Sequence, residues 1–392
     1  MCQVDQAILV SKQLTVLQVL PALEGGGVER GTLEVAAYLV RRGHRSLVMS
    51  AGGRLVAQLV AEGSQHLCWP IGVKSLRTLF LVRALRRLFR EEKIDVVHVR
   101  SRLPAWICYL AWRGMPVASR PRLVTTAHGF YSPGSYSAVM TRGEKVIAVS
   151  DAVAAYLHDN YGALDADVLR VIPRGVDPRR YHPAYQPSSV WLRQWQTQYP
   201  HLVRRRLLVL AGRLTRLKGQ HDFIRLIGAL RQECPDIHGL IVGEADASHQ
   251  AYLAELKAAV AALGLGEYIT FTGHRADLRE IFSISALVLS LSTQPEAFGR
   301  TVLEALALGV PVVGHATGGV EELLGSMYPA GMVEPGDEQG LRAGCAAVLS
   351  AGARPSALPG RFILDHMLES TLAIYEEMAV ARREGEQLAY VQ

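Results

Sequence analysis

Two carboxylates flank a short glycine-containing segment in the second half of the chain. Glu296 precedes and Glu304 follows the sequence Phe298-Gly299-Arg300-Thr301. The apolar pattern predicts a short helix from Gly299 to about Leu308, which residues 309–311 (Gly-Val-Pro) would end. The start of such a helix has free N–H groups and a positive dipole end, which bind anions. Two carboxylates that can bind hydroxyls, on either side of a phosphate site, suit a nucleotide-sugar. The spacing fits equally well an interpretation in which one glutamate caps the helix and the other is exposed to solvent.

Two cationic residues lie in another loop of the second half of the chain. A strand is predicted over 206–211, and Arg213 and Lys218 lie in the loop between it and a predicted helix over 220–233. A lysine supplies a point charge and an arginine a planar fork, and both suit the oxygens of a diphosphate. The alternative is an ordinary basic loop.

The first half opens with a strand, a glycine loop, a helix and a second strand, predicted over 14–20, 21–27, 28–40 and 46–50. This order is typical of a nucleotide-binding α/β domain. A dinucleotide fingerprint would place glycine where Arg30 stands, and an acidic residue after the second strand, where the chain has none. The pattern therefore argues against a dehydrogenase.

A histidine follows a later strand of the first half. Residues 123–127 are predicted to form a strand that ends at His128-Gly129. The carboxyl ends of parallel strands are where such sheets bind ligands. A lone histidine is more often structural, but the position of His128 makes it a candidate site residue. His98, at the end of another strand, is assigned no role.

Nearly the whole chain resembles the retaining glycosyltransferases of family four, which have the GT-B architecture, and the likeness is strongest over residues 204–340. The resemblance implies an α/β fold of two Rossmann-like domains facing a central cleft, with a C-terminal helix that crosses back to the first domain. It implies that Glu296 faces the donor sugar, that Glu304 binds the ribose, and that Arg213 and Lys218 neutralise the departing diphosphate. His128 would lie beside the sugar, which makes the implied catalytic set His128, Glu296, Arg213 and Lys218. The implied donor-binding set is Gly25, Gly26, Gly243, His274, Arg275, Phe298, Gly299, Arg300 and Glu304.

The predicted domains are an acceptor-binding domain over 1–178, completed by a helix over about 362–392, and a nucleotide-sugar domain over 179–361. Residues 172–183 are rich in proline and glycine and are expected to act as the hinge.

Bulk properties limit the class of protein. The 392 residues are long enough for separate cores, and the net charge of +6 is uneven, because residues 1–178 carry 22 basic and 14 acidic side chains. The five cysteines are far apart, which favours a reducing compartment over disulfides or zinc. The N-terminus lacks the pattern of a signal peptide, and no apolar run could span a membrane. These features predict a cytoplasmic protein.

Residues 74–93 are predicted to form a basic helix with seven cationic and two acidic residues. The simplest interpretation is a packed crossover helix with one solvated face. The alternative is a helix that lies on anionic lipid headgroups, at the inner face of the cell membrane. No nucleic-acid-binding module is recognisable, so nucleic acid is not expected as a partner.

The predicted function is retaining transfer of a sugar from a UDP-, GDP- or ADP-linked donor to a glycan or lipid-linked acceptor. The resemblance favours lipopolysaccharide or cell-envelope polysaccharide biosynthesis and implies no metal and no cofactor. One alternative is a sugar-nucleotide epimerase on the same fold, for which Glu24 is a candidate carboxylate. Another is a non-catalytic protein that binds a membrane surface.

Overall fold

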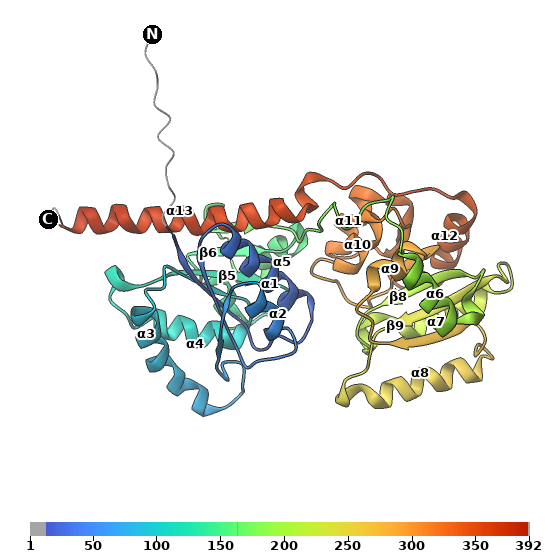
Figure 1. Cartoon of the computed structure of the whole chain (residues 1–392), viewed down its shortest axis with the longest axis horizontal. Coiled ribbons are helices and arrows are strands. Elements are labelled where there is room, and N and C mark those ends of the chain that lie inside the picture. The colour runs from blue at the N-terminus through green and yellow to red at the C-terminus, as the bar shows by residue number, and fades with distance from the viewer. Residues whose placement is uncertain (1–12, 163, 391–392) are drawn as a thin grey trace, which may run out of the picture. The chain divides into compact units, whose positions relative to one another are not determined.

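The structure is a computed structural model that describes residues 13–162 and 164–390. The chain forms two compact units (Figure 1). The first contains residues 1–149, 154–172 and 368–392, and the second contains residues 150–153 and 173–367. Residues 1–12 of the predicted first domain, and 391 and 392 of the predicted C-terminal helix, lie outside the described residues.

The first unit is built on a parallel sheet of seven strands in the order β3-β2-β1-β4-β5-β6-β7. The strands are β1 (Thr15–Val19), β2 (Arg45–Ser50), β3 (Gln65–Cys68), β4 (Val96–Val99), β5 (Arg122–Ala127), β6 (Lys145–Ala148) and β7 (Leu169–Val171). The helices are α1 (Gly27–Arg41), α2 (Val56–Ala61), α3 (Leu81–Glu91), α4 (Arg102–Arg113) and α5 (Asp151–Tyr161), with 3₁₀ turns η1 (Leu76–Phe80), η2 (Val117–Ser119) and η3 (Ser137–Thr141).

Helices cover both faces of this sheet because successive strand residues point to opposite sides. Leu47 and Met49 of β2 pack in one cluster with Leu85 of α3. Val48, between them, packs in a second cluster with Leu33 of α1. Strand β2 is therefore buried on both of its faces, as expected for a strand inside a parallel sheet.

The final helix, α13 (Leu364–Tyr390), begins in the second unit and belongs from residue 368 onward to the first. Buried Tyr375 joins it to the first sheet, because its hydroxyl lies 2.5 Å from Nδ1 of His98 on β4. Nε2 of His98 lies 2.5 Å from the hydroxyl of Thr126 on β5. His98, which received no role from the sequence, thus links this helix to two strands.

The basic segment 74–93 does not form one continuous helix. Its first part is the 3₁₀ turn η1, and α3 begins only at Leu81. Ser75 starts the turn, because its side chain accepts a hydrogen bond from the N–H of Arg77 at 3.2 Å. The prediction of a helix from residue 74 was therefore wrong at its start.

The second unit has a six-stranded parallel sheet in the order β10-β9-β8-β11-β12-β13. Its strands are β8 (Arg206–Ala211), β9 (Ile237–Val242), β10 (Ile269–Gly273), β11 (Leu287–Ser290), β12 (Val312–His315) and β13 (Met332–Val333). Its helices are α6 (Ser189–Gln198), α7 (Gln220–Leu230), α8 (Gln250–Ala262), α9 (Leu278–Ser283), α10 (Arg300–Ala307), α11 (Gly319–Met327) and α12 (Glu338–Ala351). The 3₁₀ turns are η4 (Pro200–Leu202), η5 (Arg216–Lys218), η6 (Ala247–His249), η7 (Pro329–Gly331) and η8 (Gly360–Phe362).

Two parallel sheets with helices between their strands confirm the predicted α/β fold class. Within the part of the chain that the structure describes, no helix is long and apolar enough to cross a membrane.

Candidate active site

The candidate residues of the second unit lie after the carboxyl ends of parallel strands. Strands β8 and β11 are neighbours, although the chain forms β9 and β10 between them, so the order of the strands reverses at this pair. Loops that leave the sheet at such a reversal diverge, and α/β sheets bind their ligands there. Lys218 lies in the loop after β8 and Glu296 in the loop after β11.

These two loops bring a cation and a carboxylate into contact. Nζ of Lys218 lies 2.7 Å from Oε1 of Glu296, and their side chains are 33% and 22% exposed. The hydroxyl of Ser292, a residue that is itself buried, donates a second hydrogen bond to the same oxygen. Two donors therefore hold the Glu296 carboxylate.

The backbone of Glu296 is held by the loop after β12. Its carbonyl accepts a hydrogen bond from the N–H of Gly319 at 2.8 Å, and the residue forms an isolated bridge with Gly318. The carboxylate is thus supported by segments that follow three adjacent strands, β8, β11 and β12.

Arg213 is the second predicted cation of the loop after β8. The side chain of Gln220 donates to its carbonyl at 3.1 Å, which fixes the backbone of the loop. Arg213 is exposed, and its guanidinium makes no ion pair or hydrogen bond with the residues that the structure describes. The loop therefore carries one cation paired with Glu296 and one that faces solvent.

The N-terminus of α10 is formed as the sequence predicted. Gly299 precedes the helix with a φ of 89°, in the left-handed region that favours glycine. A Cβ at this position would lie 2.9 Å from a methyl carbon of Val320, so the space also requires glycine. The first N–H groups of the helix have no acceptor within it and remain suited to an anion.

Glu304 lies within α10 and is almost fully buried, with 3% of its side chain exposed. Its Oε1 accepts a hydrogen bond from Nε of Arg300 at 3.1 Å, one helical turn earlier. A buried carboxylate needs such a partner because burial removes the water that would otherwise hydrate its charge. Arg300, expected to contribute its amide, therefore also orients the Glu304 side chain.

Phe298 contributes to the core of the second unit through its ring. The residue is buried, and its ring packs edge-on against Phe362 with the centroids 6.1 Å apart. Only its backbone is therefore available to a ligand.

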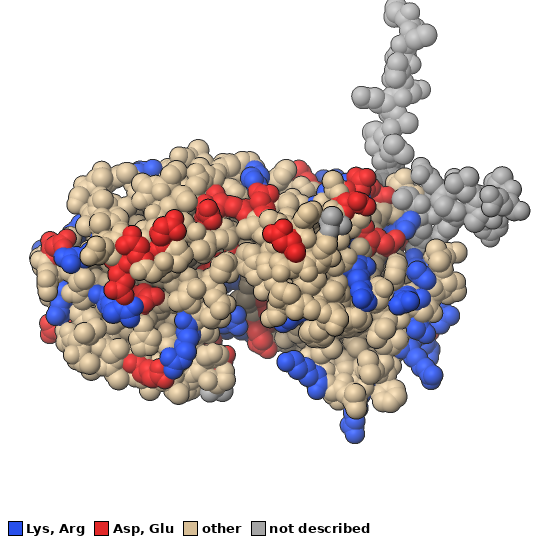
Figure 2. Space-filling model, turned by 180° about the vertical axis from the view of Figure 1, so that it is seen from behind, with Lys and Arg blue, Asp and Glu red and all other residues tan. Residues whose placement is uncertain are grey.

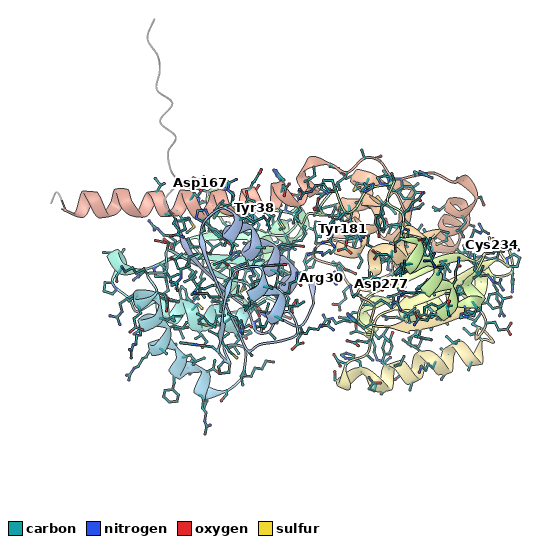
Figure 3. All side chains as sticks on the ribbon, in the orientation of Figure 1. Arg30, Tyr38, Asp167, Tyr181, Cys234 and Asp277 are labelled. Carbon is teal, nitrogen blue, oxygen red and sulfur yellow. The ribbon has the colours of Figure 1, made fainter. Side chains whose placement is uncertain are left out.

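The loops after β9 and β10 contain the remaining candidates of this unit. A Cβ on Gly243 would lie 1.9 Å from the carbonyl oxygen of Gly212, so close packing of two strand ends requires glycine there. His274 is exposed. Nε of Arg275 lies 2.8 Å from Oδ1 of Asp277, and the other nitrogens of Arg275 reach Oδ2 of Asp277 and the side chain of Gln198. Figure 3 labels Asp277 in the second unit. The Arg275 side chain is therefore occupied within the protein.

Asp277 is the centre of this small network. Nε1 of Trp191 donates to its Oδ2 at 2.6 Å, beside the bonds from Arg275. Burial acts to raise the pKa of the Asp277 carboxyl, but the hydrogen bonds from Arg275 and Trp191 outweigh it and hold that pKa below its usual range.

In the first unit, the glycine loop follows β1, at the point where the order of strands reverses between β1 and β4. Gly25 has a φ of 141°, and Gly26 precedes α1. The side chain of Arg54 crosses the loop, because its Nε donates to the carbonyl of Glu24. Arg54 is a cation at this loop that the sequence pattern did not single out.

His128 lies at the end of β5, as predicted, and its loop is fixed by Tyr131. The N–H of His128 donates to the Tyr131 hydroxyl at 3.1 Å. The guanidinium of Arg102 lies over the Tyr131 ring, 5.0 Å from its centroid. Tyr156 and Tyr161 of α5 donate hydrogen bonds to the Tyr131 carbonyl. Burial raises the pKa of the Tyr131 phenol, so this hydroxyl stays protonated at neutral pH.

The structure thus brings together the side chains of Lys218 and Glu296, and those of Arg300 and Glu304. His128, Gly25 and Gly26 belong to the first unit, and the other candidates belong to the second. Among the described residues, no three His, Cys, Asp or Glu side chains are grouped as metal ligands.

Sequence reasoning missed Ser292 and Tyr131. Ser292 stands four residues before Glu296, and the only local signal was a polar residue just beyond a buried strand. Tyr131 stands three residues after His128 in the same loop. Neither type nor spacing indicated that these hydroxyls contact the candidate site.

Comparisons with known proteins agree with this architecture. Residues 25–180 match the model of Glycosyltransferase Family 4, and residues 193–358 match the model of Glycosyl transferases group 1. The lipopolysaccharide core biosynthesis mannosyltransferase LpsB of Rhizobium meliloti is 31% identical over 51% of this chain and 53% of its own length. The chain spans about half the length of the curated relatives it matches.

Solved structures match over a longer range. A glycosyltransferase from Rickettsia africae has a TM-score of 0.80 and 30% identity, with coverage of 93% of this chain and 98% of that one. Anabaena HepE, solved with UDP and glucose, has a TM-score of 0.73 and 24% identity over 96% of this chain and 100% of its own, which shows the shared fold. The chain therefore belongs to the glycosyltransferases of the GT-B fold, with a family 4 first half and a group 1 second half.

Proposed function

We propose that this chain is a retaining glycosyltransferase that moves a sugar from a nucleotide-sugar to a glycan or glycolipid acceptor. The contact between Lys218 and Glu296 carries the proposal, because a cation suited to phosphate lies beside a carboxylate suited to sugar hydroxyls, where the strand order reverses. The N-terminus of α10 follows Glu296 in the same loop and supplies N–H groups for the diphosphate.

In the proposed reaction the bond between the sugar and the diphosphate lengthens first. Arg213, Lys218 and the first amides of α10 stabilise the negative charge that develops on the departing diphosphate. The acceptor hydroxyl attacks the anomeric carbon from the face that the leaving group vacates, and a phosphate oxygen takes its proton. Configuration is therefore retained. The steps use no metal or cofactor, as the resemblance implies, and the resemblance also makes His128 a proposed contact of the donor sugar.

When the donor arrives, its diphosphate competes with Glu296 for Lys218. Moving the ammonium to the phosphate frees Oε1 of Glu296 to accept hydrogen bonds from sugar hydroxyls. Ser292 would hold the carboxylate during this exchange, since it donates to the same oxygen. Glu304, fixed by Arg300, would bind the ribose.

The acceptor is proposed from the relatives. The name of LpsB refers to lipopolysaccharide core biosynthesis, which supports an acceptor in lipopolysaccharide or another envelope polysaccharide. The bound UDP of HepE makes a UDP-linked sugar the first donor to test, before GDP- and ADP-linked sugars.

The test is a screen of nucleotide-sugars by thermal shift and by slow donor hydrolysis, with the wild type and Glu296→Ala side by side. A donor that binds the native state should raise the melting temperature, and its hydrolysis should be lost in the variant. A product of retained anomeric configuration, followed by NMR in EDTA, supports the stereochemistry and the metal-free route. Release of an isomerised nucleotide-sugar would support an epimerase instead. Absence of any shift at millimolar donor would contradict the proposal and leave a binding protein.

A further inference from the structure

The turn that precedes α3 exposes large apolar side chains to solvent. Leu76 and Phe80 are 83% and 78% exposed, and Val73 and Leu79 are 49% and 50% exposed. These four residues lie within the segment 73–80, which we call the apolar tip. Single exposed apolar residues are common, whereas a contiguous group marks an interaction site.

The backbone of the apolar tip is ordered by its own hydrogen bonds. The Thr78 hydroxyl donates to the carbonyl of Val73 at 2.6 Å, and the N–H of Thr78 donates to the carbonyl of Ser75 at 3.0 Å. Thr78 itself is buried, as is Ile71 just before the tip. The chain is therefore anchored at these two inward positions, and the apolar side chains of the tip point outward.

Basic residues surround the apolar tip. Lys74 and Arg77 lie within it, and Arg83 and Arg87 lie on the exposed face of the first turns of α3. Lys74, Arg77 and Arg83 form no ion pair with any residue that the structure describes, whereas Arg87 is paired with Glu91. Figure 2 shows Lys and Arg, and no Asp or Glu, along the lower edge of the first unit on the face that it displays.

Helix α3 has no apolar face left for contact with a partner outside the first unit. Its apolar face is used within the first unit, where Leu85 and Phe89 are buried in the core. The interpretation of residues 74–93 as a packed helix with a solvated face is therefore correct for α3 and wrong for the turn before it. Figure 1 shows this turn at the lower edge of the first unit, ahead of α3.

We propose that the apolar tip inserts into the interface of an anionic lipid bilayer, with Leu76 and Phe80 below the headgroups and Lys74, Arg77 and Arg83 among the lipid phosphates. Apolar burial and attraction to anionic lipid act together at such surfaces. A soluble anionic protein would match the charges, but it would leave the protruding leucine and phenylalanine without an apolar environment. The inference does not depend on the proposed sugar transfer, because no donor-site candidate lies in the tip.

The test is co-sedimentation of the full chain with two kinds of vesicle. One kind contains phosphatidylcholine alone, and in the other about one-third of the lipid is phosphatidylglycerol. The wild type should bind the anionic vesicles, and binding should weaken as salt rises, because the headgroup attraction is screened. Leu76→Ser with Phe80→Ser should lower the partition constant by about ten- to a hundredfold in the anionic vesicles. Arg77→Glu should lower it by about tenfold or more.

Matched controls lie on the second unit. Leu263 is 46% exposed, and Leu263→Ser should leave vesicle binding unchanged, as should Arg354→Glu at an exposed arginine. The tip variants should keep the wild-type melting temperature and the wild-type response to nucleotide-sugars, since they alter only exposed side chains. The melting temperature and the response to nucleotide-sugars therefore separate a failure of the membrane proposal from a failure of the proposed enzymatic function.

Equal binding of wild type and tip variants to anionic vesicles would overturn the proposal. So would a dimer in lipid-free solution that the Leu76→Ser, Phe80→Ser variant converts to a monomer, because the tip would then be covered by a second copy of the chain.

Discussion

The ammonium of Lys218 lies 2.7 Å from the carboxylate of Glu296, although the two residues are 78 positions apart in the sequence. The contact exists because β8 and β11 are adjacent strands, and each residue belongs to the loop that follows one of them. Each group thus neutralises the other at the site that we propose for the donor. A donor diphosphate must displace the carboxylate from the lysine.

Glu296→Gln should separate binding from turnover. The amide keeps the shape of the side chain but no longer neutralises Lys218, so a nucleoside diphosphate should bind at least as tightly as to the wild type. Turnover should fall by about a hundredfold or more, because the charge beside the reacting sugar is lost. Calorimetry with the nucleoside diphosphate and a donor-consumption assay measure the two effects. Glu334→Gln, at an exposed glutamate of the same unit, is the control and should change neither.

Lys218→Ala should weaken binding of the nucleoside diphosphate by about tenfold or more, since it removes a charge-assisted hydrogen bond to phosphate. Its effect on the free energy of unfolding should be about 1 kcal/mol or less, because the ion pair is partly exposed. Lys257→Ala, at an exposed lysine on α8, should leave the affinity as in the wild type. Equal affinities for all three proteins would exclude Lys218 from the phosphate site.

Ser292→Ala tests the second donor to Glu296. Without the hydroxyl, the carboxylate keeps only Lys218, and it has no support once that lysine moves to the phosphate. Turnover should fall by about tenfold, the usual scale for one hydrogen bond to a charged group. Ser285→Ala is a matched control, because the Ser285 hydroxyl also makes a partly buried hydrogen bond, at 2.6 Å to the carbonyl of Ile281. A similar fall of turnover in both variants would indicate a general structural effect instead.

Tyr131→Phe should disturb the His128 loop without removing the ring. The variant loses the acceptor for the N–H of His128 but keeps the surface on which Arg102 lies. Turnover should fall by about three- to tenfold, the range of one neutral hydrogen bond, while affinity for a nucleoside diphosphate stays unchanged. Tyr136→Phe is the control, because Tyr136 is 46% exposed. A wild-type rate for Tyr131→Phe would mean that the hydrogen bond does not position His128 for the reaction.

His238 on β9 should make stability depend on pH. Burial, followed by the nearby charges of His201 and Arg205, lowers the pKa of His238 from 6.5 to about 4. The unfolded chain therefore binds a proton between pH 6.5 and 4 that the folded protein does not, so stability is complete above pH 6.5 and falls as the pH drops towards 4. The loss should reach about 2–3 kcal/mol at pH 4.

Urea unfolding at several pH values measures this loss. His238→Gln cannot titrate, and its side chain can still reach the Thr270 hydroxyl, which lies 2.9 Å from Nε2 in the wild type. Its free energy of unfolding should fall less between pH 6.5 and 4 than that of the wild type. Parallel curves for the two proteins would mean that His238 keeps its ordinary pKa.

Much of the second unit follows from local patterns. A buried strand, a loop with Arg213 and Lys218, and a helix after it can be read in order, because strand and helix periods differ and glycine or proline marks the ends. The same holds for Glu296, Gly299 and Glu304, whose spacing places them around one helix start. Even the glycine at 299 is a local requirement, since the backbone there has a positive φ.

Contacts between distant segments could not be predicted from local sequence patterns. Tyr375 meets His98 across 277 positions, and Ser292 was one polar residue among many until its hydroxyl was found against Glu296. The exposure of Leu76 and Phe80 was likewise hidden, because an apolar residue in a basic segment is normally expected to face the core.

The sequence alone therefore determined the order of strands and helices, the strand-end loops and the chemical types of the candidate residues, because these depend on neighbours along the chain. Only the tertiary structure decided which loops meet, which charges neutralise one another and which apolar side chains remain uncovered. Those properties depend on which strands become neighbours in the sheet, and the packing of distant segments sets that order.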